Sequence, residues 1–137
     1  MSRKKLEWED KYSVGVVEID NQHKRMFAVI NELLDSISNN DPEEHLTSII
    51  EGLLQYKKFH FATEEKYFKE FNYEGTAEHV AKHLEFGKRL DDLKQKYPSN
   101  TIEFAFALAD FLEDWLIDHL LVMDQKYKQC FKEHGLK

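Results

Sequence analysis

Four segments of this chain carry apolar residues at every third or fourth position, and this pattern constrains the fold more than any other feature. The segments cover roughly residues 20–38, 42–71, 76–97 and 100–122, and the apolar face of the last one is expected to end at Val122. Such spacing places the apolar side chains on one face of an α-helix, and no segment sustains the period-two alternation of a strand. Only five Gly and two Pro interrupt the 137 residues, which favours long helices. The sequence therefore predicts an all-α fold.

Short polar breaks separate the four segments and set their relative direction. The residues expected as N-caps are Asp20, Asp41, Thr76 and Asn100, with Pro42 at a first helical position. Connections this short make neighbouring helices antiparallel. We therefore predict an up-down-up-down four-helix bundle with a short C-terminal helix.

The first 18 residues show no helical pattern and are expected to form an irregular N-terminal arm. Trp8 and the apolar residues in 14–17 are available to pack this arm on the bundle. No repeat, low-complexity tract or linker divides the chain. Residues 1–137 are therefore predicted to form a single domain, as the length also suggests.

The inward stripes contain polar residues where a bundle core requires leucine, isoleucine or phenylalanine. These exceptions occur in all four segments: His23, His60, Glu64, His79, His83 and His119. A lone histidine in an apolar stripe is more often a hydrogen-bonded core residue than a ligand. Burying six polar groups, however, is costly unless they bind one another or a metal. The pattern therefore indicates a metal site inside the bundle.

Two of these segments contain ligand pairs spaced by four residues. His60 and Glu64 form an HxxxE motif, and His79 and His83 form an HxxxH motif. Each motif places two side chains one helical turn apart on the same face, close enough to share a metal or to bridge two. HxxxH alone is a weak signal in a chain with seven histidines. The ordered series of a single His, HxxxE, HxxxH and HxxxxD, one for each helix, is a strong one.

The last pair, His119 and Asp124, has an unusual spacing. Five residues correspond to about 500° of α-helix, which places Asp124 about 140° away from His119. An ideal helix would not direct both side chains at one site. Either the helix is distorted or ends there, or Asp124 is a surface residue.

The types of candidate ligand restrict the metal. Five imidazoles and two carboxylates are too many for one tetrahedral zinc ion, and the absence of thiolates argues against iron–sulfur clusters. Imidazole with carboxylate suits iron, among other metals, and seven ligands from four helices suggest two ions bridged by carboxylates. A ferritin-like site would need a Glu-x-x-His motif on two helices, and the sequence contains none.

The combined motifs resemble those of the hemerythrin family, and most closely its single-domain bacterial members. The resemblance covers essentially the whole chain and rests on Ile19-Asp20-Asn21-Gln22-His23, His60-x-x-x-Glu64, His79-x-x-x-His83 and His119-x-x-x-x-Asp124. It implies two iron ions with an oxo or hydroxo bridge. One iron would be held by His79, His83 and His119 and the other by His23 and His60, with Glu64 and Asp124 bridging both.

The same resemblance implies a function and a pocket. The second iron would keep one open coordination position, where dioxygen binds reversibly. The residues expected to line the oxygen pocket are Met26, Phe61, Trp115 and Leu116. Tyr56 is expected to be a plain core residue, and His45 and His134 are expected at the surface. No catalytic residue is predicted.

Composition excludes several other classes of protein. A net charge of −7 without a basic stripe is unsuited to binding nucleic acid or an anionic membrane. No apolar run reaches the roughly 20 residues that span a bilayer, and no secretory signal is visible. With a single cysteine, Cys130, the expected compartment is the cytoplasm.

Three alternatives to an oxygen carrier or store remain open at this point. The site could report oxygen or redox state as a sensor module, although sensor versions usually stand beside signalling domains. It could serve an enzyme that handles peroxide or nitric oxide or repairs iron sites, which should place a proton donor at the open iron. Simple iron storage is disfavoured by a capacity of two ions for each chain.

Overall fold

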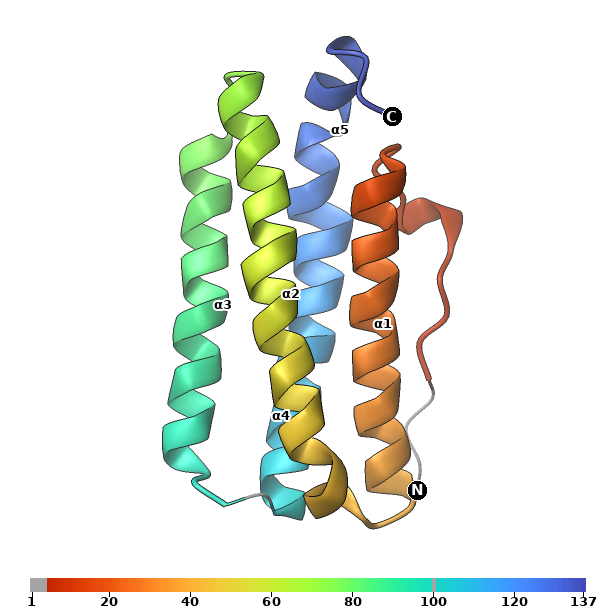
Figure 1. Ribbon diagram of the computed structural model, residues 1–137, viewed down its shortest axis with the longest axis vertical. Helices are drawn as coiled ribbons and strands as arrows, with labels where there is room; N and C mark the ends of the chain where they lie inside the picture. The colour runs from red at the N-terminus through yellow and green to blue at the C-terminus, as the bar shows by residue number, and fades with distance from the viewer. Residues whose placement is uncertain (1–4, 100) are drawn as a thin grey trace.

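The computed structural model describes residues 5–99 and 101–137, which are mostly helical and contain no strand. The elements in chain order are η1 (Asp10–Tyr12), α1 (Val17–Ser38), α2 (Pro42–Glu70), α3 (Thr76–Lys96), α4 (Ile102–Asp118), η2 (His119–Met123) and α5 (Asp124–Glu133). Figure 1 shows α1 to α4 side by side, with connections at alternating ends. The all-α four-helix bundle is thus confirmed. None of the described helices is long and apolar enough to cross a membrane.

The helix ends agree with the sequence pattern at one break and differ at others. Asp41 takes the N-cap position of α2 and Pro42 begins the helix, as predicted, although the Asp41 side chain makes no capping hydrogen bond. In α3, Gly75 takes the N-cap position, and the predicted cap Thr76 is instead the first helical residue. For α4 the cap is Thr101, whose hydroxyl oxygen accepts a hydrogen bond from the Phe104 backbone N–H. The predicted cap Asn100 lies outside the described residues.

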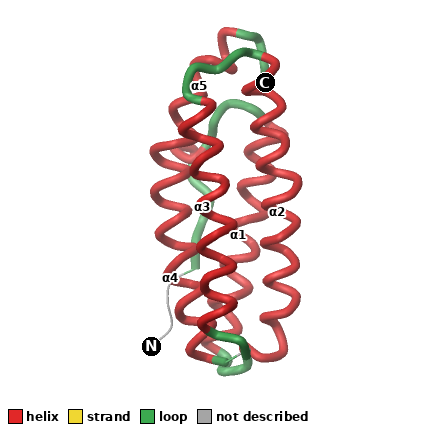
Figure 2. Tube along the Cα trace, turned by 90° about the vertical axis from the view of Figure 1, so that its left-hand side faces the viewer, coloured by secondary structure: helices red, strands yellow, loops and turns green. Residues whose placement is uncertain are grey.

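The arm is fixed to the start of α1 by a residue that was predicted to cap that helix. Helix α1 begins at Val17, so Asp20 lies in its first turn and does not cap it. Its carboxylate instead accepts hydrogen bonds from the Ser13 hydroxyl at 2.6 Å and the Val14 N–H at 2.9 Å. Val14 and Val16 are buried, while Val17 is exposed. The arm runs along the bundle as Figure 2 shows.

The hydrophobic core consists of two clusters separated along the helices. The larger contains Met26, Ile30, Leu53 and many other residues of α1 to α4. The smaller joins the arm to α5 through residues that include Val14, Ile19, Phe68, Tyr127 and Phe131. On α1, the candidate ligand His23 lies between Ile19 of the smaller cluster and Met26 of the larger. The polar residues therefore occupy a belt between two apolar regions.

The helical rod that contains α4 and α5 changes its register in the middle. Residues His119–Met123 form a π-helical turn, η2, in which the Asp124 N–H donates to the His119 carbonyl, five residues back. This turn takes up one more residue than an α-helical turn. Val122, which the sequence pattern placed inward, is 50% exposed, whereas Met123 is 5% exposed. The inward position of Val122 was therefore wrong, because the period of the helix changes there.

Candidate metal centre

Seven candidate ligands from α1, α2, α3, η2 and α5 meet in the belt between the two apolar clusters. All are nearly inaccessible, with exposures of 0–3%: His23, His60, Glu64, His79, His83, His119 and Asp124. The structure groups their donor atoms within 4.8 Å of one another in two overlapping sets. One set is Glu64, His79, His83 and His119, and the other is His23, His60, Glu64 and Asp124. We call these the three-histidine side and the two-histidine side.

The Asp124 carboxylate lies between the two sides. Its Oδ1 atom is 3.0 Å from Nε2 of both His79 and His119. Its Oδ2 atom is 3.0 Å from Nε2 of His23. Each oxygen therefore faces a different side, which is the arrangement that a bridging carboxylate requires.

Glu64 contacts both sides through one of its oxygens. Oε1 is 3.0 Å from His83 Nε2 and 3.4 Å from His60 Nε2. The other oxygen, Oε2, accepts a hydrogen bond from the Tyr127 hydroxyl at 2.5 Å. Glu64 is therefore held in place by a buried tyrosine from α5 while it faces histidines of both sides.

The π-helical turn resolves the unusual spacing of His119 and Asp124. An i→i+5 turn brings residues five positions apart to the same face, whereas an α-helix would separate them by about 140°. Asp124 is fully buried. The interpretation of Asp124 as a surface residue is therefore excluded, and the distorted helix is the correct alternative.

The unsatisfied polar atoms of the site test whether a metal fits. Both ring nitrogens of His79 and of His119, and both oxygens of Asp124, are buried without a hydrogen-bond partner among the described residues. In addition, Nε2 of His23 lies 3.0 Å from Nε2 of His60. Leaving so many polar groups unpaired is costly. Cations would satisfy these converging lone pairs, and nitrogen with carboxylate oxygen is a donor set that suits iron.

A chain of hydrogen bonds fixes the tautomer of His60. The Thr63 hydroxyl donates to the Phe59 carbonyl at 2.8 Å, so its oxygen accepts from the Gln22 amide nitrogen at 3.1 Å. The Gln22 oxygen therefore faces His60 and accepts from Nδ1–H at 2.6 Å. Nε2 of His60 is left with a free lone pair directed at the site, as metal ligation requires.

His83 also has a partner at its Nδ1 atom, but this partner is a carboxylate, whereas that of His60 is a neutral amide. Its Nδ1 lies 2.8 Å from a carboxylate oxygen of Glu65, which is partly exposed. A carboxylate acceptor makes an imidazole a more basic ligand than an amide acceptor does. The sequence interpretation assigned no role to Glu65, Gln22 or Tyr127. Each of them is close to a candidate ligand in the sequence, which is the signal that could have found them. Glu65 follows Glu64, Gln22 precedes His23, and Tyr127 lies one helical turn after Asp124.

Protonation in the cluster follows from burial and from the two carboxylates. Burial lowers the pKa of His60 to about 3, so that this ring is neutral at pH 7. Burial also opposes the charged form of His79, but the carboxylates of Asp124 and Glu64, which lie 3.0 Å and 3.7 Å from its Nε2, outweigh burial and raise the pKa to about 9. The surrounding histidines hold the pKa values of Asp124 and Glu64 below their usual range despite burial. A metal would displace the proton of His79.

The residues expected to line an oxygen pocket are buried close to the ligands. The Phe61 ring stacks on His83 with centroids 3.8 Å apart, and the Trp115 ring stacks on His119 at 4.2 Å. Met26 and Leu116 belong to the same apolar cluster as these rings. The structure therefore places Phe61 and Trp115 against candidate ligands, and all four residues belong to one buried apolar cluster.

The remaining histidines lie away from the centre, as expected. His45 is 42% exposed and 3.6 Å from Asp41. His134 is exposed and its ring stacks on Phe71. Tyr56 packs against the larger apolar cluster, as expected, and its ring also stacks on His60 with centroids 4.7 Å apart.

Comparison with known proteins relates this arrangement to one family. The family model "Hemerythrin HHE cation binding domain" matches residues 14–131. A bacteriohemerythrin from Clostridium acetobutylicum is 27% identical over 124 residues, which cover 88% of this chain and 96% of that protein. A bacteriohemerythrin from Pseudomonas aeruginosa is 31% identical over 89% of this chain and 78% of its own length.

A hemerythrin-like relative shows a comparable extent of similarity. A hemerythrin-like protein from Naegleria gruberi is 30% identical over 121 residues, covering 88% of this chain and 89% of that protein. The matched region includes all seven candidate ligands, from His23 to Asp124. The resemblance noted in the sequence is thereby confirmed, and the chain belongs to the hemerythrin family.

Proposed function

We propose that this protein binds dioxygen reversibly at a pair of bridged iron ions and serves oxygen storage, transport or delivery. The observation that carries the proposal is the unequal division of five buried histidines around two buried carboxylates. Three histidines lie on one side and two on the other. The iron pair, when bound, would supply the electrons that dioxygen accepts and returns. The single cysteine, Cys130, is compatible with a cytoplasmic location.

The ligand count identifies the side that can accept dioxygen. His79, His83 and His119, both carboxylates and one bridging oxygen would complete six positions on one iron. His23 and His60 with the same bridges would fill only five positions on the other. The open position would therefore lie on the two-histidine side, where Met26 and Tyr56 line the space beside His60.

The surrounding residues would make binding reversible by excluding water and protons. Met26, Phe61, Trp115 and Leu116 are each at most 6% exposed. An apolar wall of this kind disfavours charge separation, so bound dioxygen would leave as dioxygen rather than as superoxide or peroxide.

A visible spectrum of the iron-loaded protein tests this function. The protein is reduced without air, exposed to oxygen and then purged with inert gas, and the iron content is measured in parallel. We expect a colour that appears with oxygen and bleaches on purging, at two irons per chain. A colour that appears once and persists would contradict reversible binding. Chelator-treated protein, which should show neither change, serves as the control.

One observation favours a second function, that of a di-iron peroxidase. Tyr56 stacks on His60, and its pKa is raised by burial and by the charges of Asp124 and Glu64. A tyrosine that stays protonated beside the open position can donate a proton to a peroxide, as an enzyme would require. Peroxide turnover that falls in Tyr56→Phe would support this function. Reversible oxygenation that is unaffected by Tyr56→Phe would support the carrier.

A further inference from the structure

A groove between α1 and α2 leads from the surface to the two-histidine side. Its volume is about 410 Å³, and the residues that define it include Gln22, Met26, Val29, Gly52, Tyr56 and His60. We call it the α1–α2 groove. Two of these residues, Met26 and His60, are only 1% exposed, so the inner end of the groove reaches side chains that face the candidate metal centre.

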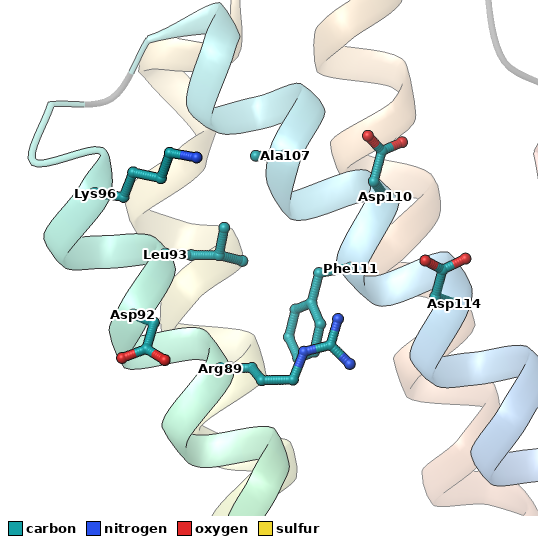
Figure 3. Close-up of a pocket in the computed structure, with 8 residues that line it drawn as sticks. All are labelled: Arg89, Asp92, Leu93, Lys96, Ala107, Asp110, Phe111 and Asp114. Carbon is teal, nitrogen blue, oxygen red and sulfur yellow. The ribbon is translucent and has the colours of Figure 1, made fainter.

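A second cavity of the same volume gives a useful contrast. It lies between α3 and α4, where the Arg89 guanidinium stacks over the Phe111 ring at 4.6 Å (Figure 3). Its rim carries charged side chains, among them Asp92, Asp110 and Asp114. None of the described residues that line it is a candidate ligand. Cavity size alone therefore does not distinguish the α1–α2 groove; its contact with His60 does.

Aromatic rings cover the three-histidine side. Phe61 lies flat on His83, Trp115 lies flat on His119, and the Phe68 ring meets His79 with centroids 4.8 Å apart. Rings packed in this way leave little room for a passing molecule, because protein cores are close-packed. On the other side, the flexible thioether of Met26 lines the α1–α2 groove together with His60 and is 1% exposed.

The groove is kept open by a glycine in the middle of α2. A Cβ atom added at Gly52 would lie 3.2 Å from a methyl carbon of Val29, across the groove on α1. Glycine inside a helix costs about 1 kcal/mol relative to alanine. Arg25 is the charged residue of the lining, and the amides of Gln22 and Gln55 supply polar groups, while the rest is apolar or aromatic apart from His60. Such a lining suits a small uncharged molecule.

We propose that dioxygen reaches the metal centre through the α1–α2 groove, with the side chains of Met26 and Tyr56 as the gate at its inner end. This inference rests on the proposed function for the identity of the ligand. It adds the route, which predicts how substitutions far from the iron alter the rates of binding and release.

Filling the groove tests the route. Gly52→Leu fills the groove from α2 by placing a side chain against Val29. Ala28→Leu, at an exposed groove position, fills it from α1. A blocked route slows entry and exit equally, so we expect the association and dissociation rates of dioxygen both to fall about tenfold, with the equilibrium affinity unchanged. Ala62→Leu, on the exposed face of α2 outside the groove, is the matched control and should leave both rates as they are.

A measurement without iron provides an independent readout. In the Trp8→Phe background Trp115 is the single tryptophan, and oxygen that reaches it quenches its fluorescence. We expect Gly52→Leu and Ala28→Leu to lower the quenching constant in the metal-free chain, and Ala62→Leu to leave it unchanged.

The outcomes separate this inference from the proposed function. Unchanged rates in both groove variants, or an altered affinity with unequal changes in the two rates, would overturn the route while reversible oxygenation still stood. Absence of any reversible oxygenation would overturn the proposed function. In that case the quenching constants alone decide whether the groove admits oxygen.

Discussion

The two sides of the metal centre differ in what covers them. On the three-histidine side, flat aromatic stacking holds His83 and His119 in fixed orientations. A carboxylate, Glu65, supports His83 from outside. This side is therefore rigid and fully enclosed, as a coordinatively complete metal would allow.

The two-histidine side is less rigidly covered and lies closer to solvent. His60 is oriented by the neutral amide of Gln22 and covered by Tyr56, and both of these residues line the α1–α2 groove. The side with fewer ligands is also the side with the more adaptable cover. The comparison teaches that ligand number and packing together select the place where a small molecule can bind.

The largest expected effect comes from the residue that joins the two sides. Asp124→Asn keeps the shape of the side chain but removes the charge that faces His23, His79 and His119. We expect iron content to fall from two per chain to near zero, with loss of about 3 kcal/mol or more of metal-dependent stability. Elemental analysis and chemical denaturation measure these quantities. Asp118→Asn, an exposed position six residues earlier, is the control. Two irons per chain in Asp124→Asn would show that the sides do not need this bridge.

Removing one histidine from either side sharpens the comparison. His119→Ala takes one nitrogen from the proposed six-coordinate iron and should weaken or abolish assembly. His23→Ala leaves only one imidazole on the other side, so we expect selective loss of that iron and of oxygen binding. Iron content and oxygen-induced absorbance are the measurements. A His119→Ala protein with two irons and normal oxygen binding would refute the ligand assignment.

A carboxylate placed in the pocket tests which wall adjoins the open position. Met26→Glu and Leu116→Glu each introduce a charge that favours release of superoxide, so the autoxidation rate should rise about tenfold or more. The rate is followed as the decay of the oxygenated spectrum. Ala62→Glu, on the exposed face of α2, should have no effect. If neither pocket variant changes the rate, the pocket lies elsewhere.

Replacing the hydrogen-bond partner of His60 with a carboxylate should make the two sides more alike. Gln22→Glu gives His60 a carboxylate acceptor, like the one that His83 has in Glu65. A more basic imidazole stabilises ferric iron, so we expect a several-fold faster autoxidation with iron content unchanged. Glu65→Gln alters the other side and should have a smaller effect. Equal effects of the two variants would argue that the sides are electronically equivalent.

The smallest effect on the site is expected from substituting Tyr127, whose hydroxyl contacts Glu64. Tyr127→Phe removes the hydroxyl that donates to Glu64 Oε2 but retains the buried ring. The free energy of unfolding should fall by about 1–2 kcal/mol, because a buried carboxylate oxygen loses its donor. Denaturant titration of the metal-free protein measures this change. A loss of iron in this variant would show that Tyr127 is required for ligation as well as for stability.

Much of the fold was predictable because it depends on local periodicity. Four apolar stripes and short breaks specify the bundle, and the polar exceptions in those stripes mark the buried residues of the site. The outward position of Val122 could not be predicted, because the sequence pattern assumes a constant helical period and the π-helical turn changes that period. The cap at Thr101 was missed because neighbouring polar residues compete for that position.

Other parts of the site depend on contacts between distant segments. The partners Gln22 and Glu65 are neighbours of candidate ligands in the sequence, but the local pattern does not show that they reach His60 and His83 on other helices. The position of Tyr56 on His60 likewise depends on rotamers that periodicity does not specify. The sequence therefore predicts which residues are candidate ligands, and the packing of the helices decides which residues support and cover them.

The position of Asp124 opposite His23 also has a consequence for the unfolded chain. These residues are about 100 positions apart in sequence, and a metal held by both would close a loop whose entropic restriction is worth about 5 kcal/mol by the relation used for disulfides. The chain has only one cysteine and so cannot make an internal disulfide. Iron would therefore act as a reversible cross-link. A chelator would remove the proposed oxygen-binding site and this cross-link in the same step.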